Sequence, residues 1–161
     1  MKLNQDVLNL LNEQIGHEYE NYVLYEQASA YFADKGMDEA AKLFRKQADG
    51  EMDHARRFTD YVRDAGGKVV IPTIKAQKSD YVSGEEVFLA AYTREQETTA
   101  KIYTLRDLAW NAGDHATFEA LTWFVNEQVE EENLTEKLLT VVRGFGEKNL
   151  YLIEAYLSHM A

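Results

Sequence analysis

Four long stretches of the chain carry apolar residues three and four positions apart, the pattern of helices with one buried face. Good helix formers fill these stretches, and most of the glycines and the single proline lie between them. Ser83 and Glu86 form a capping box ahead of the third stretch. We expect helices over about residues 5–34, 38–65, 84–111 and 115–143, and a short fifth helix over about 147–159.

The connection between the second and third helices differs from the others. Residues 67–83 have no helical period, whereas the remaining connections are short. One long connection is typical of a four-helix bundle in which the chain travels the length of the molecule before the third helix begins. Residues 68–74 would also fit a short β-strand, but the sequence offers it no partner. We therefore predict an all-α fold: a four-helix bundle with a long crossover and a short fifth helix, in a single domain over residues 1–161.

Each predicted buried stripe is apolar at its ends and polar in its middle. A carboxylate in a protein core is costly unless it is neutralised, paired or bound to metal. The stripes contain no Lys or Arg at the level of these acids, so one or two metal dications are the expected counter-charge. The stripes are Leu11, Glu18, Tyr25 and Phe32; Phe44, Gln47, Glu51, His54, Phe58, Tyr61 and Ala65; Phe88, Ala91, Glu95, Thr98, Ile102, Leu105 and Ala109; and Leu121, Phe124, Gln128, Glu131, Thr135, Leu138 and Val142.

Glu51 and His54 stand one helical turn apart on one face, so both side chains can reach one metal ion or bridge a pair. The same Glu-x-x-His spacing is found in the metal sites of di-iron carboxylate bundles. Hard oxygen ligands with one imidazole suit iron, manganese or zinc, and the spacing does not choose among them. The remaining histidines, His17, His115 and His159, are interpreted as surface or capping residues.

Charge and composition narrow the function classes. The formal net charge is -11, which disfavours nucleic acid and anionic membranes and favours cations, although solubility alone would also explain it. The chain has no cysteine, which excludes disulfides and thiolate metal sites. No apolar run is long enough to cross a bilayer, and residues 1–6 lack the pattern of a signal peptide. We expect a cytoplasmic protein.

These motifs resemble the non-haem ferritins of bacteria and archaea. The resemblance covers nearly the whole chain and includes the terminal residues 147–159, which are similar to the short fifth helix around the four-fold axes of the ferritin shell. It implies storage of iron: Fe(II) is oxidised with O2 or H2O2, and Fe(III) mineral is kept inside a hollow homo-oligomer of 24 subunits. The residues that carry the resemblance are Glu18 and Tyr25, residues 51–54, Glu95 and Gln96, residues 123–128 and residues 130–132.

The resemblance also implies two iron sites that share the carboxylate of Glu51. A tyrosine and a tryptophan near the iron pair, Tyr25 and Trp123, match proposed electron donors, although core packing is an equally good interpretation of both. The residues that match the iron ligands are Glu18, Glu51 and His54 in the first site and Glu51, Glu95 and Glu131 in the second, with Gln128 as a neighbour of the second site.

A third iron site of many bacterial ferritins is matched only in part. Glu127 and Glu130 match two of its ligands and Glu131 is shared with the second site, but a glycine, Gly50, stands where the family usually has a glutamate. The third site is therefore in doubt, and Glu130 would equally suit a solvated acidic face.

Two other functions on the same bundle are the alternatives. A haem-binding bacterioferritin would use a methionine at the position of Met52, but its fourth helix carries Glu-x-x-His where this chain has Gln128 and Glu131. Haem is therefore not expected, and Met52 is interpreted as a packing residue. A di-metal peroxidase or oxidase is the second alternative. A purely structural bundle is disfavoured by the buried acids.

Overall fold

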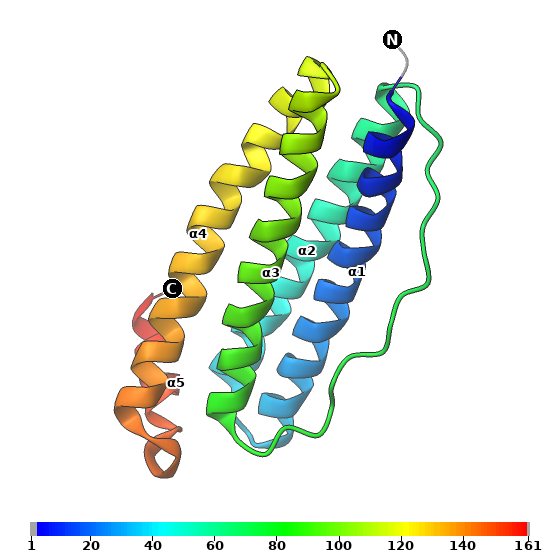
Figure 1. Cartoon of the computed structure of the whole chain (residues 1–161). Helices are drawn as coiled ribbons and strands as arrows, with labels where there is room; N and C mark the ends of the chain where they lie inside the picture. The colour runs from blue at the N-terminus through cyan, green and yellow to red at the C-terminus, as the bar shows by residue number, and fades with distance from the viewer. Residues whose placement is uncertain (1–2, 161) are drawn as a thin grey trace.

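The computed structural model describes residues 3–160, which form helices and no strand (Figure 1). In the four-helix bundle α1 runs antiparallel to α2 and α3 antiparallel to α4, while α2 and α3, which the long crossover joins, run parallel. The predicted all-α bundle with its long crossover and short fifth helix is confirmed, and residues 68–74 are not a strand. The elements are α1 (Gln5–Asp34), α2 (Asp38–Asp64), α3 (Gly84–Asn111), α4 (His115–Phe145), the 3-10 turn η1 (Glu147–Asn149) and α5 (Leu152–Met160).

Local capping explains where the long helices begin. The side chains of Asn4, Ser83 and Asp114 each accept a hydrogen bond from a backbone N–H in the first turn that follows. Ser83 Oγ accepts from Glu86 N at 3.1 Å, as the predicted capping box requires. The carboxylate of Glu86 reaches back to Val82 N at 2.7 Å, one residue earlier than the N-cap residue that a capping box normally uses.

The C-terminal segment departs from the predicted single helix over 147–159. Gly146 ends α4 with a positive φ of 73°, and residues Glu147–Asn149 form a 3-10 turn before α5 begins at Leu152. The reason lies in a distant contact: the carboxylate of Glu147 accepts hydrogen bonds from Gly84 N and Glu85 N at the start of α3. This contact holds Glu147 against α3 and delays the start of the last helix.

The crossover, residues 65–83, runs along the outside of α1 from one end of the bundle to the other (Figure 1). The side chain of Asn12 holds it by donating to Lys68 O and accepting from Val70 N, both at 3.0 Å. Pro72 lies directly over Gly16, where a Cβ would overlap the proline ring. A glycine inside α1 therefore lets the crossover approach the helix closely.

Two separate apolar clusters fill the ends of the bundle. One contains the stacked rings of Phe32 and Phe44, with centroids 5.5 Å apart, together with the buried side chains of α5. The other contains Phe58 stacked on Phe124, with centroids 3.8 Å apart. The buried layer between the clusters is polar, as the interrupted stripes predicted.

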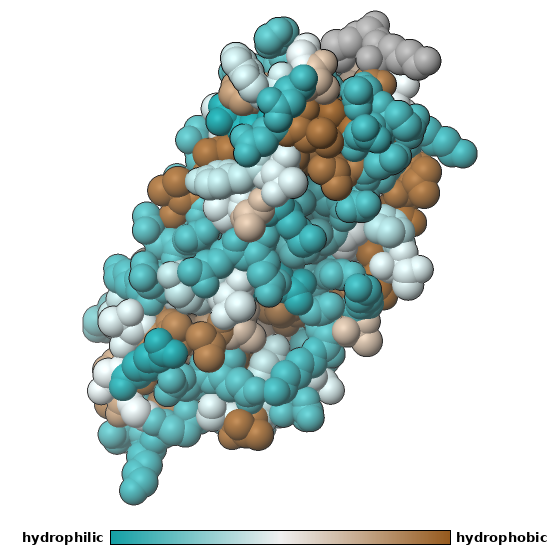
Figure 2. Space-filling model, viewed as in Figure 1, coloured by the Kyte–Doolittle hydropathy of each residue, from teal (hydrophilic) through white to brown (hydrophobic). Residues whose placement is uncertain are grey.

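Hydrophilic residues cover most of the face seen in Figure 2, and hydrophobic residues lie there in separate patches. Large apolar side chains that are exposed on the single subunit include Trp110 and Tyr151, which are 58% and 63% exposed. Among the described residues, no helix combines the length and the apolar character needed to cross a membrane.

Candidate metal centre

The middle of the bundle contains three potential ligands from two helices in one tight group. Glu18 of α1 and Glu51 and His54 of α2 each offer one ligand atom, and these atoms all lie within 4.8 Å of one another. His54 Nδ1 is 3.2 Å from Glu51 Oε2 and 4.0 Å from Glu18 Oε2. All three side chains are buried, so this group has the chemistry and the proximity to hold a dication.

Glu95 of α3 and Glu131 of α4 stand outside this tight group but face the same layer. Glu95 is fully buried and accepts hydrogen bonds from the hydroxyl of Tyr25 and from Gln128 Nε2, the latter at 3.1 Å. Glu131 is partly buried and accepts from Gln47 Nε2 at 2.6 Å. Four helices thus each supply one glutamate to the polar layer.

The four glutamates of this layer are removed from solvent to a large extent, and their carboxylates repel one another. Burial, followed by the neighbouring carboxylate of Glu51, raises the pKa of Glu18 well above its ordinary value. Burial and then the carboxylate of Glu95 do the same to the pKa of Glu51, and they raise the pKa of Glu131 to about 7. Burial also raises the pKa of Glu95. Within residues 3–160, none of the four forms an ion pair with Lys or Arg, so a bound cation would relieve the repulsion.

Glu127, Glu130 and Gly50 lie differently with respect to this group. Glu127 Oε2 is 3.7 Å from His54 Nε2, on the side of the imidazole that faces away from Glu51. Glu130 is exposed and lies outside the tight group. Gly50 lines a groove of about 720 Å³ with Glu127 and His54, and a Cβ at Gly50 would meet no atom within 4 Å.

Two aromatic residues contact the candidate ligands, and both are also well packed. The ring of Tyr25 is fully buried and stacks on Phe44, with centroids 6.0 Å apart, while its hydroxyl donates to Glu95. Trp123 meets His54 edge-on at 5.6 Å and carries the guanidinium of Arg57 over its ring at 3.6 Å. Both residues therefore contact a candidate ligand and also pack against other side chains, so the contacts fit either interpretation, electron donor or packing residue.

His17 was predicted to be a surface or capping residue, and that prediction is wrong. The side chain is buried, and its Nε2 lies 2.7 Å from Thr98 Oγ1. Burial, with Arg94 and then Lys101, lowers the pKa of His17 to about 3. His115 and His159 are exposed, as expected.

Sequence reasoning also missed a second polar line on α1. Gln14, His17 and Asn21 follow the three-and-four spacing of a helix face, and all three are buried. Gln14 Nε2 donates to Glu18 Oε1 at 2.7 Å. This spacing is the sequence signal for the second polar line, which lies beside the predicted line through Glu18.

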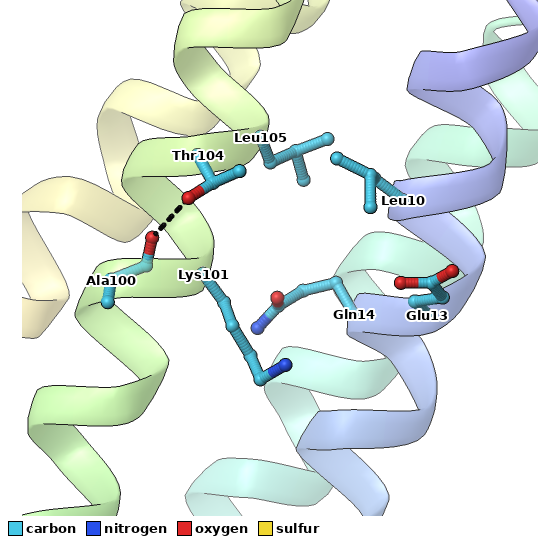
Figure 3. A pocket seen from close by; sticks show the side chains of 7 residues that line it. All are labelled: Leu10, Glu13, Gln14, Ala100, Lys101, Thr104 and Leu105. Carbon is cyan, nitrogen blue, oxygen red and sulfur yellow. Dashed lines mark hydrogen bonds between the residues drawn. The ribbon is translucent and has the colours of Figure 1, made fainter.

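A pocket lies between α1 and α3 (Figure 3). Its volume is about 280 Å³, and Gln14, Lys101 and Leu105 are among its lining residues. Gln14 thus lines this pocket and also donates a hydrogen bond to Glu18, a candidate ligand.

Comparison with known proteins places this architecture in a family. The ferritin-like domain matches residues 8–145. The chain belongs to the ferritin family. It is 35% identical over 158 residues to the bacterial non-heme ferritin of Staphylococcus epidermidis, covering 97% of this chain and 95% of that one. It is also 35% identical over 158 residues to the bacterial non-heme ferritin of Escherichia coli, covering 97% and 96%.

A solved ferritin has the same architecture. The open-pore ferritin of the hyperthermophilic archaeon Archaeoglobus fulgidus superposes with a TM-score of 0.93 at 30% sequence identity, covering 97% of this chain and 96% of that one. The ferritin resemblance that the motifs indicated is thus confirmed, and so is the ferritin-like fold.

Proposed function

We propose that this ferritin stores iron by oxidising Fe(II) at a di-iron centre between its helices and keeping the Fe(III) product as mineral inside a hollow shell. The observation that carries the proposal is the tight group of Glu18, Glu51 and His54, with Glu95 and Glu131 facing the same buried layer. The relatives named as non-heme ferritins support iron as the metal.

In this proposal Glu51 is the bridging ligand. Glu18, Glu51 and His54 hold one ion, and Glu51, Glu95 and Glu131 hold the other, with Gln128 orienting Glu95 through its amide. Two Fe(II) ions each lose one electron. Either O2 takes the two electrons and two protons to give H2O2, or H2O2 takes two electrons and two protons to give two waters.

Tyr25 and Trp123 are proposed as residues that can supply a further electron. Their support is contact: Tyr25 donates a hydrogen bond to Glu95, and Trp123 lies against His54. Glu127 and Glu130 are proposed as ligands of a weakened third site, because Gly50 contributes no carboxylate there. We propose that the centre works without haem. Met52, the residue at the position of the bacterioferritin haem ligand, is partly buried on α2 and is interpreted as a packing residue.

The shell is proposed to contain 24 subunits, as the family resemblance implies. Exposed aromatic residues on the single subunit, among them Trp110 and Tyr151, support extensive contacts between copies. A cytoplasmic location stays a prediction, and cell fractionation tests it.

Light scattering after size-exclusion chromatography, followed by aerobic loading with Fe(II), tests the storage proposal. We expect one large particle many times the 18.5 kDa subunit mass, retaining far more iron than the centres alone bind. A monomer that turns over peroxide without retaining iron would favour the di-metal peroxidase instead. A Soret band in proportion to subunits would favour the bacterioferritin alternative.

A further inference from the structure

Asn21 of α1 is buried beside two candidate ligands. Its amide nitrogen Nδ2 is 3.3 Å from Glu18 Oε2, 3.5 Å from Glu51 Oε2 and 3.1 Å from Thr98 Oγ1. Its amide oxygen Oδ1 accepts from Arg94 Nη1 at 3.3 Å. One amide thus contacts carboxylates from two different helices.

The amide nitrogen of Asn21 is shared among Thr98, Glu18 and Glu51. An amide nitrogen has two hydrogens. The hydroxyl of Thr98 donates its own hydrogen to Arg94 O at 2.9 Å, so Thr98 Oγ1 accepts from Asn21. One Asn21 hydrogen is therefore used by Thr98, and the other is left for the carboxylates of Glu18 and Glu51. A carboxylate oxygen accepts more than one hydrogen bond, so Glu18 Oε2 can accept from Asn21 and still face a cation. Glu51 Oε2 also lies 3.2 Å from His54 Nδ1, and a cation bound by both residues would replace that contact.

Arg94 determines which way the amide faces. A guanidinium only donates, so it requires the oxygen of Asn21 on its side and leaves the NH2 group for the carboxylates. Arg94 is itself fixed by Gln77 of the crossover, whose Oε1 accepts from Nη2 at 2.6 Å. Glu97 and Glu20 lie 3.5 Å and 4.0 Å from the guanidinium. The crossover is therefore linked to the metal centre through two side chains.

We infer that Asn21 is a positioning residue that holds Glu18 and Glu51 together for a divalent cation, and that Arg94, braced by Gln77, sets the direction of its amide. This inference rests on the proposed function. Hydrogen bonds to metal ligands commonly change metal affinity by about 10–100-fold. The electrostatic effect of Arg94 has the opposite sign, since a cationic side chain near the site repels a metal ion.

Anaerobic titration of the full-length protein with Co(II), followed by its visible d–d absorption, tests the inference. We expect Arg94→Leu and Asn21→Leu to weaken the tighter Co(II) site by about 10–100-fold. Arg94→Lys is expected to lose clearly less affinity than Arg94→Leu, because an ammonium also donates to Oδ1 but lacks the fork that joins Asn21 to Gln77. Arg143→Leu, which removes a cation from an exposed pair with Glu85, is the charge-matched control and should leave Co(II) affinity unchanged.

Unchanged or tighter Co(II) binding by Arg94→Leu overturns the inference, because charge removal alone predicts tighter binding. Should Asn21→Leu fail to assemble, the comparison of Arg94→Leu with Arg94→Lys decides. A wild-type protein that binds no Co(II) overturns the metal centre and this inference with it. If the wild-type protein binds Co(II) and the Asn21 and Arg94 variants bind it with the same affinity, the positioning role is overturned and the metal centre stands.

Discussion

The carboxylate of Glu154 in α5 accepts hydrogen bonds from the backbone N–H of Ala40, at 2.9 Å, and of Glu39, at 2.7 Å. The residue before α2, Met37, provides no side-chain cap, so Glu154 satisfies the first turn of α2 from a distant part of the chain. The carboxylate also lies at the positive end of the α2 dipole. The short last helix is thereby attached to the start of the second.

Replacing this carboxylate should loosen both helices. We expect Glu154→Ala to lower the free energy of unfolding by about 1–2 kcal/mol, the usual value of a helix cap. Thermal unfolding measures the loss, and limited proteolysis should cut α5 sooner. Glu119→Ala, an exposed glutamate of α4, is the matched control. Equal melting temperatures for the two variants would contradict the cap.

The buried acids are expected to serve metal rather than the fold. Glu51→Ala should slow Fe(II) oxidation by roughly tenfold or more and should be the most damaging single change, because Glu51 serves both ions. Glu95→Ala and the double variant Glu18→Ala with His54→Ala should also slow it. The metal-free variants should be as stable as wild type or more so, since they delete buried charge that lacks a cationic partner. Stopped-flow absorbance and melting temperature are the two measurements.

A structural network of acids would give the reverse result. Truncation would then leave polar neighbours unsatisfied and destabilise the fold by about 1–3 kcal/mol, with oxidation near the wild-type rate. Asp49→Ala, which removes an exposed acid from the same helix, should change neither property.

The raised pKa of Glu131 makes stability depend on pH. The pKa is about 7 in the folded protein against an ordinary 4.5, so the folded state binds more protons between these values. The contribution is fully present below pH 4.5 and is lost as pH rises through 7, an effect of up to about 3 kcal/mol. We expect Glu131→Gln to stabilise the metal-free protein at pH 8 and to have little effect at pH 4.5. Denaturant titrations of both proteins at the two pH values measure this. The same difference in free energy of unfolding between Glu131→Gln and wild type at pH 8 and at pH 4.5 would refute the prediction.

Restoring a side chain at Gly50 should restore the third site. The position is open, so Gly50→Glu fits without overlap and adds a carboxylate beside Glu127. In an anaerobic titration, the number of tightly bound Fe(II) ions per subunit should rise from about two in the wild-type protein to about three in Gly50→Glu, one for each set of ligands. Gly50→Gln is the control, which has similar size but no charge. Three tight ions in the wild-type protein would show that Glu127 and Glu130 suffice.

Much of this arrangement was predictable because helical spacing places residues without reference to distant contacts. The stripe that contains Phe88, Glu95 and Ala109 is buried along its whole length, as predicted. The buried position of His17 was not predicted, because His17 belongs to a second polar line of α1 beside the line through Glu18. The link from Gln77 to Arg94 was beyond prediction, since the path of a crossover without helical period is decided by the surfaces it meets. The 3-10 turn at Glu147 likewise depends on a contact with α3, far away in sequence.

The separation of the apolar side chains into two end clusters affects how the metal-free subunit fluctuates. We expect each cluster to be a local unit of stability, and the acid layer between them to be a boundary across which cooperativity is weak. Backbone amides at mid-helix should therefore exchange with solvent faster than those in either cluster. A cation bound by Glu18 and Glu51 ties adjacent helices together at that boundary and stabilises only the folded state. Under the proposed function, iron loading would join the two units into one, and hydrogen exchange at the middle of the bundle would report occupancy of the centre.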